Sequence, residues 1–162
     1  MKNICCILLI FSSNLLYAKE SSIDLFTLYK ELHADPELSY QEFKTSEKLA
    51  LILEDIGYEV KRNIGGNGVV ALLKNGSGKT VMLRADMDGL PVEEKTGASY
   101  ASTKKSINSE GKEVFTMHAC GHDVHMTVLI GAAEYLYENK SAWQGNLLLV
   151  LEPAEEVSGG AR

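Results

Sequence analysis

The sequence contains little that would build a disulfide framework or bind nucleic acid. Only three cysteines occur among the 162 residues, and two of them, Cys5 and Cys6, lie within the first eighteen positions. The formal net charge of −6 argues against nucleic acid and against an anionic membrane surface as partners, because both attract basic proteins. The sequence has no low-complexity tract and no internal repeat. A hydrophobic fraction of 45% is that of an ordinary globular protein.

The first eighteen residues differ from the rest of the chain. Lys2 is their only charged residue, and residues 4–16 are largely apolar. This order is typical of a secretory signal peptide, and the apolar run is too short for a membrane span. We therefore expect residues 1–18 to be a signal peptide and residues 19–162 to be secreted or periplasmic, without membrane contact. Leu16 fits the small-residue preference of a cleavage site poorly, so a retained anchor is the alternative.

Residues 117–125 bring three histidines, a thiol and a carboxylate into nine positions. Thiolate and imidazole are ligands of Zn²⁺ and its first-row neighbours, whereas Mg²⁺ and Ca²⁺ prefer oxygen. Cys120 and His122 are two residues apart, so an extended backbone places both side chains on one side. Gly121 permits a close approach to an ion, and Asp123 is a good N-cap for a following helix. The pattern predicts a transition-metal site at a helix start.

Spacing alone does not select the ligands. His118 shares the extended face with Cys120 and His122, whereas His122 and His125 share a face if the segment is helical. A hydrogen-bonded core cluster is a further alternative. So is a thiol enzyme with Cys120 as nucleophile and a nearby histidine as base. The tight local spacing disfavours the thiol enzyme, because nucleophile and base usually come from distant parts of a fold.

Two acidic clusters follow apolar segments that are typical of buried strands. Residues 145–151 are followed by Glu155 and Glu156, and residues 79–85 run into an Asp-rich turn that contains Asp88. Ligands of open α/β sheets bind at the carboxyl ends of strands. A metal ion lowers the pKa of a bound water, and a nearby carboxylate takes the proton. One glutamate can therefore coordinate metal while the other transfers a proton. Solvated turns are the simpler alternative.

Helix-like and strand-like segments alternate along the chain, which predicts an α/β fold with three α/β/α layers and a mixed central sheet. Asn75 and Gly76 favour an antiparallel connection between the first two strands, and Gly57 is a helix stop. The predicted helices are residues 23–33, 45–57 and 124–139, the predicted strands are residues 68–74, 79–85 and 147–151, and residues 100–113 form a loop or an edge hairpin.

Four segments together resemble one enzyme family. Residues 33–39, 84–91, 117–125 and 153–156 are similar, in this order, to signature blocks of the aminoacylase/carboxypeptidase-type metallo-amidohydrolases. The branch they resemble most contains hippurate hydrolases, N-acyl-amino-acid amidohydrolases and auxin-conjugate hydrolases. The resemblance extends over nearly everything from about residue 25 onward.

The resemblance implies a role for each matching residue. Cys120, His122 and Glu156 match metal ligands, Glu155 matches the general base, and Asp88 matches the catalytic-site carboxylate that supports the ligands from behind. It also implies two divalent ions, Zn²⁺ or Mn²⁺, and hydrolysis of the amide bond of N-acyl amino acids or similar small molecules.

This sequence is shorter than members of the family it resembles. Family members carry two further ligand histidines beyond the Glu-Glu pair, with an inserted lid or dimerisation domain between them, whereas this sequence ends at Arg162. We therefore expect residues 19–162 to be the N-terminal part of the catalytic domain, with a sheet incomplete at its C-terminal end. A full-length form is expected to be a homodimer. The alternative is an inactive truncated secreted fragment, or a binding protein with a relic metal site.

Overall fold

The computed structural model describes residues 22–160, so the predicted signal peptide lies outside the described residues. Within this part of the chain, no helix combines the length and the apolar character that a membrane span requires. In chain order, the elements are α1 (Leu25–Ala34), α2 (Phe43–Ile56), β1 (Glu59–Ile64), β2 (Gly68–Asn75), β3 (Thr80–Asp86), β4 (Lys105–Ile107), β5 (Glu113–Phe115), α3 (His122–Glu138), β6 (Gly145–Glu152) and two short 3-10 turns, Lys140–Ala142 and Glu155–Val157.

A mixed four-stranded sheet with the order β1-β2-β6-β3 forms the centre of the fold. The β1–β2 and β2–β6 pairs are antiparallel, and β3 is parallel to β6. The predicted α/β class is confirmed. β2 and β3 run in opposite directions, as the turn at Asn75 and Gly76 predicts, but they are not neighbours because β6 lies between them. The apolar side chains of β6 are best buried in this central position.

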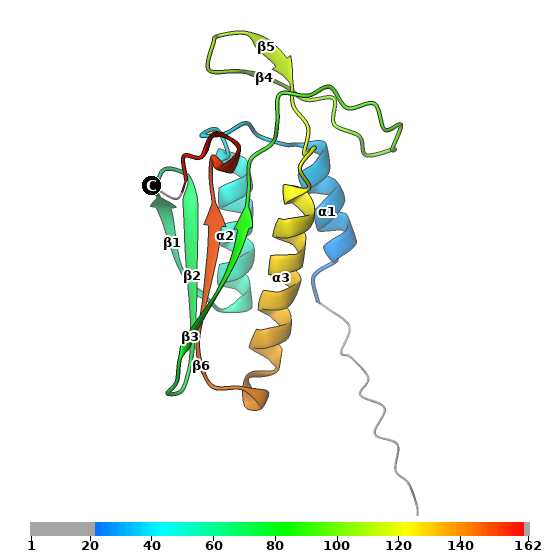
Figure 1. The fold of residues 1–162 in the computed structure, drawn as a ribbon. Coiled ribbons are helices and arrows are strands. Elements are labelled where there is room, and N and C mark those ends of the chain that lie inside the picture. The colour runs from blue at the N-terminus through cyan, green and yellow to red at the C-terminus, as the bar shows by residue number, and fades with distance from the viewer. Residues whose placement is uncertain (1–21, 161–162) are drawn as a thin grey trace, which may run out of the picture.

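All three long helices lie on one side of the sheet (Figure 1). α2 packs against β1 and β2, α3 packs against β3 and β6, and α1 packs against α3. Leu53 of α2, Ile130 of α3 and Leu149 of β6 are fully buried between these layers. The helix stop predicted at Gly57 is confirmed, because this residue ends α2 in a left-handed conformation with φ 114°.

The opposite face of the sheet is not covered by any helix of residues 22–160. Leu72, Leu148 and Met82 lie side by side in the register of β2, β6 and β3, and Val70 and Val150 form the next row. The side chains on β2 and β6 are half-buried, and Met82 on the edge strand is 59% exposed. Two of the three expected layers are therefore present in the described part of the chain.

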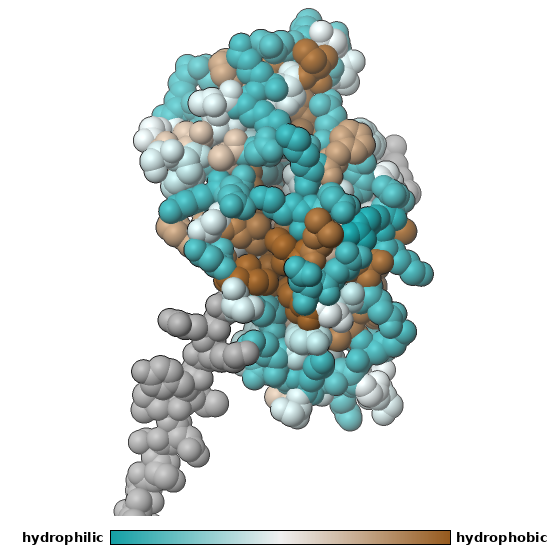
Figure 2. Space-filling model, turned by 180° about the vertical axis from the view of Figure 1, so that it is seen from behind, coloured by the Kyte–Doolittle hydropathy of each residue, from teal (hydrophilic) through white to brown (hydrophobic). Residues whose placement is uncertain are grey.

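The helical side also carries apolar surface. Figure 2 shows hydrophobic side chains gathered on this side of the molecule. A groove between α1 and α3 is lined by Leu25, Phe26, Tyr29, Val124, Thr127 and Val128.

Candidate metal centre

The carboxyl ends of β3 and β6 meet at one edge of the sheet, as their parallel pairing requires. Asp86 at the end of β3 is in register with Glu152 at the end of β6. The 3-10 turn that follows β6 carries Glu155 and Glu156. The β4–β5 hairpin projects beyond the same edge (Figure 1). The predicted clustering of carboxylates at this edge is confirmed.

Cys120 and His122 lie where a loop becomes α3. Gly121 is the N-cap of the helix, with a left-handed φ of 82° that glycine adopts without strain. The prediction of Asp123 as N-cap was wrong. This residue lies in the first turn of the helix, where its Oδ2 is 2.6 Å from Nδ1 of His33. The cap position requires positive φ, which favours glycine over aspartate.

Asp88 contacts three of the predicted site residues, His122, Glu155 and Glu156. Its main-chain oxygen is 2.8 Å from Nδ1 of His122, and because a carbonyl only accepts, Nδ1 donates and Nε2 is left for a ligand. Its carboxylate accepts hydrogen bonds from the Ser39 hydroxyl and from the backbone N–H groups of Glu155 and Glu156. Burial alone would raise the pKa of Asp88. The hydrogen bonds that Asp88 accepts, including one from His122, outweigh burial, so the pKa lies below its usual value. The carboxylate is therefore ionised at neutral pH.

Cys120, His122 and Glu156 form a group whose potential ligand atoms all lie within 4.8 Å of one another. Nε2 of His122 is 3.9 Å from Oε1 of Glu156 and 3.7 Å from Oε2 of Glu155. Oε1 of Glu156 is buried and has no hydrogen-bond partner among the described residues. A buried oxygen without a partner is costly, and a cation between these three side chains would satisfy it. The donor set of nitrogen, sulfur and oxygen fits Zn²⁺.

The electrostatics of the site also favour a cation. Burial alone would lower the pKa of His122, but Asp88 and Asp86 raise it to about 9. The hydrogen bond and the charge of Glu156 raise the pKa of the Cys120 thiol. Both shifts arise from the negative potential of converging carboxylates, and the same potential attracts a divalent ion.

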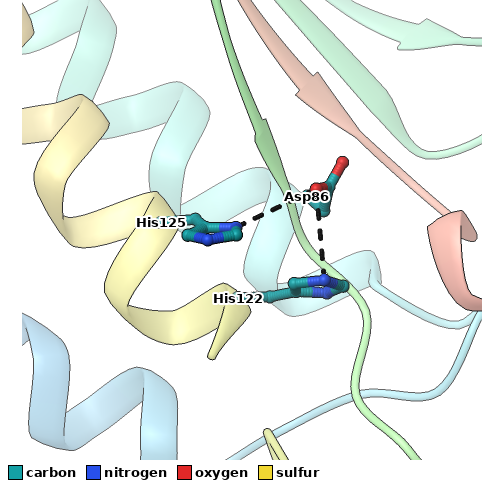
Figure 3. A group of neighbouring side chains, drawn as sticks. All are labelled: Asp86, His122 and His125. Carbon is teal, nitrogen blue, oxygen red and sulfur yellow. Dashed lines mark ion pairs between the residues drawn. The ribbon is translucent and has the colours of Figure 1, made fainter. Parts of the chain in front are cut away.

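A second group of potential ligands shares His122. Asp86 lies between two histidines of α3, with its Oδ2 4.0 Å from Nε2 of His122 and 3.9 Å from Nδ1 of His125 (Figure 3). Arg84 holds Asp86 from the other side, with 3.3 Å between Nη1 and Oδ1. The structure thus brings together both the extended-face pair and the helical-face pair that the sequence allowed.

His118 belongs to neither group. Its side chain is buried, and neither ring nitrogen has a hydrogen-bond partner in residues 22–160. Burial lowers the pKa of His118 to about 4, so the ring is neutral.

Sequence reasoning missed two residues that shape the site, Ser39 and Glu42. Both come from the loop between α1 and α2 and contact residues far away in the sequence. Neither lies in a metal-ligand pattern. The only available signal was that Ser39 ends the first segment that resembles the family.

Comparison with known proteins confirms the resemblance. The model of peptidase family M20/M25/M40 matches residues 82–162, half of the chain, and the chain belongs to this family. Hippurate hydrolase of Campylobacter jejuni is 44% identical over 133 residues, which are 82% of this chain and 32% of that protein. N-acetyl-L-cysteine deacetylase of Bacillus subtilis is 40% identical over 159 residues, which are 92% of this chain and 36% of that protein.

Solved structures agree with these relatives. A dinuclear metal binding peptidase of the M20 family from Bacillus subtilis superimposes with a TM-score of 0.75 and 35% identity, over 85% of this chain and 36% of that one. The chain spans about a third of the length of the curated relatives it matches.

Proposed function

We propose that the chain carries part of the catalytic site of a metal-dependent amidohydrolase that acts on N-acyl amino acids or similar small amides. The observation that carries this proposal is the convergence of Cys120, Nε2 of His122 and the unpartnered Oε1 of Glu156 at the carboxyl edge of the sheet. Relatives named hippurate hydrolase and N-acetyl-L-cysteine deacetylase support the substrate class.

The ligands of the proposed centre are Cys120, His122 and Glu156. We propose two divalent ions per complete site, Zn²⁺ or Mn²⁺, because a solved relative is a dinuclear metal binding peptidase. Three ligands are about as many as one catalytic zinc ion requires. The remaining ligands are therefore expected from outside the described residues, since the relatives are about three times as long as this chain.

In the proposed reaction, Glu155 is the general base. Bound divalent ions would polarise the amide carbonyl and acidify the attacking water. The Glu155 carboxylate is 38% exposed, so it can accept a proton from that water while the water oxygen attacks the carbonyl carbon. When the carbon–nitrogen bond breaks, Glu155 returns the proton to the leaving nitrogen. Asp88 holds the backbone of both glutamates and the ring orientation of His122 throughout.

A thiol hydrolase is the weaker candidate for this site. A cysteine nucleophile needs a lowered thiol pKa, whereas Glu156 raises the pKa of Cys120. The two reactions also differ in their sensitivity to inhibitors.

The direct test is hydrolysis of a panel of N-acyl amino acids by a purified full-length form of the protein, with and without a chelator. We expect activity that a chelator abolishes and that Zn²⁺ or Mn²⁺ restores. Activity that survives chelation but not thiol alkylation would establish the thiol enzyme instead. A protein that binds the ions without hydrolysing any substrate would be a binding protein with a relic site.

Export and dimerisation are separate proposals. We propose secretion or periplasmic localisation from the pattern of residues 1–18, and a homodimer for a full-length form. N-terminal sequencing of protein recovered from cell fractions tests export, since cleavage is expected after residue 18. Sedimentation analysis of the full-length form tests the dimer.

A further inference from the structure

Glu42 is a fully buried carboxylate whose contacts point away from its own helix. It occupies the N-cap position of α2 but makes no capping hydrogen bond. Its Oε1 accepts hydrogen bonds from the backbone N–H groups of Tyr40 at 3.0 Å and Ala154 at 2.7 Å. Its Oε2 accepts from Nδ2 of Asn67 at 3.0 Å. Glu42 therefore connects the start of α2 to the segment that follows β6.

Ala154 is the residue at which the chain turns from β6 into the glutamate-bearing turn. It is fully buried and has a left-handed backbone conformation, with φ 53°, which a non-glycine residue keeps only when its surroundings enforce it. The N–H of Ala154 is held by Glu42, and the next two N–H groups, of Glu155 and Glu156, are held by Asp88. Three successive amides are thus fixed by two buried carboxylates.

We propose that Glu42 is a positioning residue for the Glu155–Glu156 pair. By holding the N–H of Ala154, it keeps the left-handed turn in place and directs the two glutamate side chains toward His122. The part of this inference that concerns metal binding rests on the proposed function. The part that concerns the conformation of the turn does not.

The contacts of Glu42 predict different outcomes for two substitutions. Glu42→Ala removes the acceptor and leaves the N–H groups of Tyr40 and Ala154 without a partner. Glu42→Gln keeps Oε1 as the acceptor for both, and its new amide is accommodated when the Asn67 amide rotates to present its oxygen. Glu42→Gln should therefore rescue what Glu42→Ala loses.

Glu37 provides a matched control. It is also a buried carboxylate, and it accepts hydrogen bonds from the backbone N–H groups of Lys44 and Thr45 in the first turn of α2. Glu37→Ala removes a comparable set of bonds next to the same helix. It touches none of the amides of residues 154–156.

The first experiment is backbone amide hydrogen exchange of the metal-free protein. In Glu42→Ala, the amides of Ala154, Glu155 and Glu156 should exchange faster than in the parent, whereas Glu42→Gln and Glu37→Ala should leave them protected. If Glu42→Ala does not fold, Glu42→Asp replaces it, because the shorter side chain cannot reach Ala154. The proposal would be overturned if Glu42→Ala left the exchange rates of these amides unchanged, or if Glu37→Ala reduced their protection equally.

The second experiment is titration with Co²⁺, whose absorption reports a bound Cys120 thiolate. Loss of a residue that orients a ligand costs about 10–100-fold in metal affinity. We expect a loss of that size and an altered cobalt spectrum in Glu42→Ala, with Glu42→Gln and Glu37→Ala near the parent. Unchanged affinity in Glu42→Ala would show that the turn needs no positioning by Glu42. A parent protein without a thiolate band would contradict the proposed function, and hydrogen exchange would still decide whether Glu42 holds the turn.

Discussion

His122 is the residue on which both groups of potential metal ligands depend. Its Nδ1 is committed to the main-chain oxygen of Asp88, and its Nε2 faces the carboxylates of Asp86, Glu155 and Glu156. The ring orientation that Asp88 imposes therefore leaves Nε2 as the ligand atom for either group, and the other side chains of each group decide which one binds the ion. The spacing of these residues in the sequence did not select the ligands, whereas the family resemblance implied Cys120, His122 and Glu156.

Cys120→Ala should distinguish the two groups. The side chain is exposed, so stability should change little, by about 0.5 kcal/mol or less. Metal analysis of a full-length form should show the loss of most of one of the two ions. His125→Ala is the matched control, because this residue belongs only to the group with Asp86. Loss of metal in His125→Ala together with normal content in Cys120→Ala would assign the site to the other group.

Glu155→Gln should separate proton transfer from metal binding. The substitution keeps the shape of the side chain but removes the base, so turnover of an N-acyl amino acid should fall by about 10²–10⁴-fold with metal content unchanged. Glu156→Gln is the contrasting variant, because there we expect metal to be lost as well. Near-normal turnover in Glu155→Gln would mean that this residue is only a solvated neighbour.

At the scale of elements, the sequence predicted the helices and strands whose apolar residues recur at regular spacing. The predicted ends of these elements lie within about two residues of the observed ends. β1 was missed because only Val60 and Ile64 of its six residues are apolar, so this edge strand contains no continuous apolar run. Arg62 of β1 pairs with Glu47 and Glu54 of α2. β1 is held in the sheet by these contacts and by its pairing with β2, all of which are tertiary interactions. No run of apolar residues in the sequence marks these contacts.

The junction between α1 and α3 should make stability depend on pH. His33 at the end of α1 lies 2.6 Å from Asp123 of α3 and 3.1 Å from Glu94. Burial lowers the pKa of His33, but the hydrogen bonds to the two carboxylates outweigh burial and raise it above 6.5. A raised pKa means that this stabilisation is fully present below the pKa of the unfolded state and is lost as pH rises through that of the folded state.

We therefore expect His33→Gln to reduce the free energy of unfolding by about 1–3 kcal/mol near pH 6, the range for hydrogen bonds to charged groups. The difference from the parent should shrink toward about pH 9. Urea unfolding of both proteins at the two pH values measures it. A difference that grows with pH would show that His33 is neutral in the folded protein. The rings and ionisable groups that face His33 are Glu94, Asp123, Tyr29, Tyr100 and, through a weaker charge interaction, His118.

At the scale of the whole molecule, the sequence predicted the edge at which the candidate site lies, because strand ends and acidic residues coincide there. It did not predict the supports that Ser39 and Glu42 provide. Both residues reach the site from a loop more than forty positions away from their partners, and no local pattern encodes such contacts. The layers were predicted from the order of helices and strands alone. This order does not show how much apolar surface of the sheet residues 22–160 leave uncovered.

The uncovered face of the sheet should control the association of residues 22–160 when they are produced alone. The rows formed by Leu72, Leu148 and Met82 and by Val70 and Val150 make a continuous apolar surface beside an unpaired edge strand, and such surfaces promote self-association. We expect concentration-dependent oligomers in sedimentation velocity experiments.

Met82→Lys should shift these oligomers toward monomer, because a lysine ammonium within the contact would lose its hydration on burial. Val128→Lys is the matched control. Val128 is 63% exposed, close to the 59% of Met82, but it lines the groove between α1 and α3 on the other side of the molecule. If Val128→Lys dissolves the oligomers and Met82→Lys does not, association occurs through the helical groove and the sheet face tolerates water.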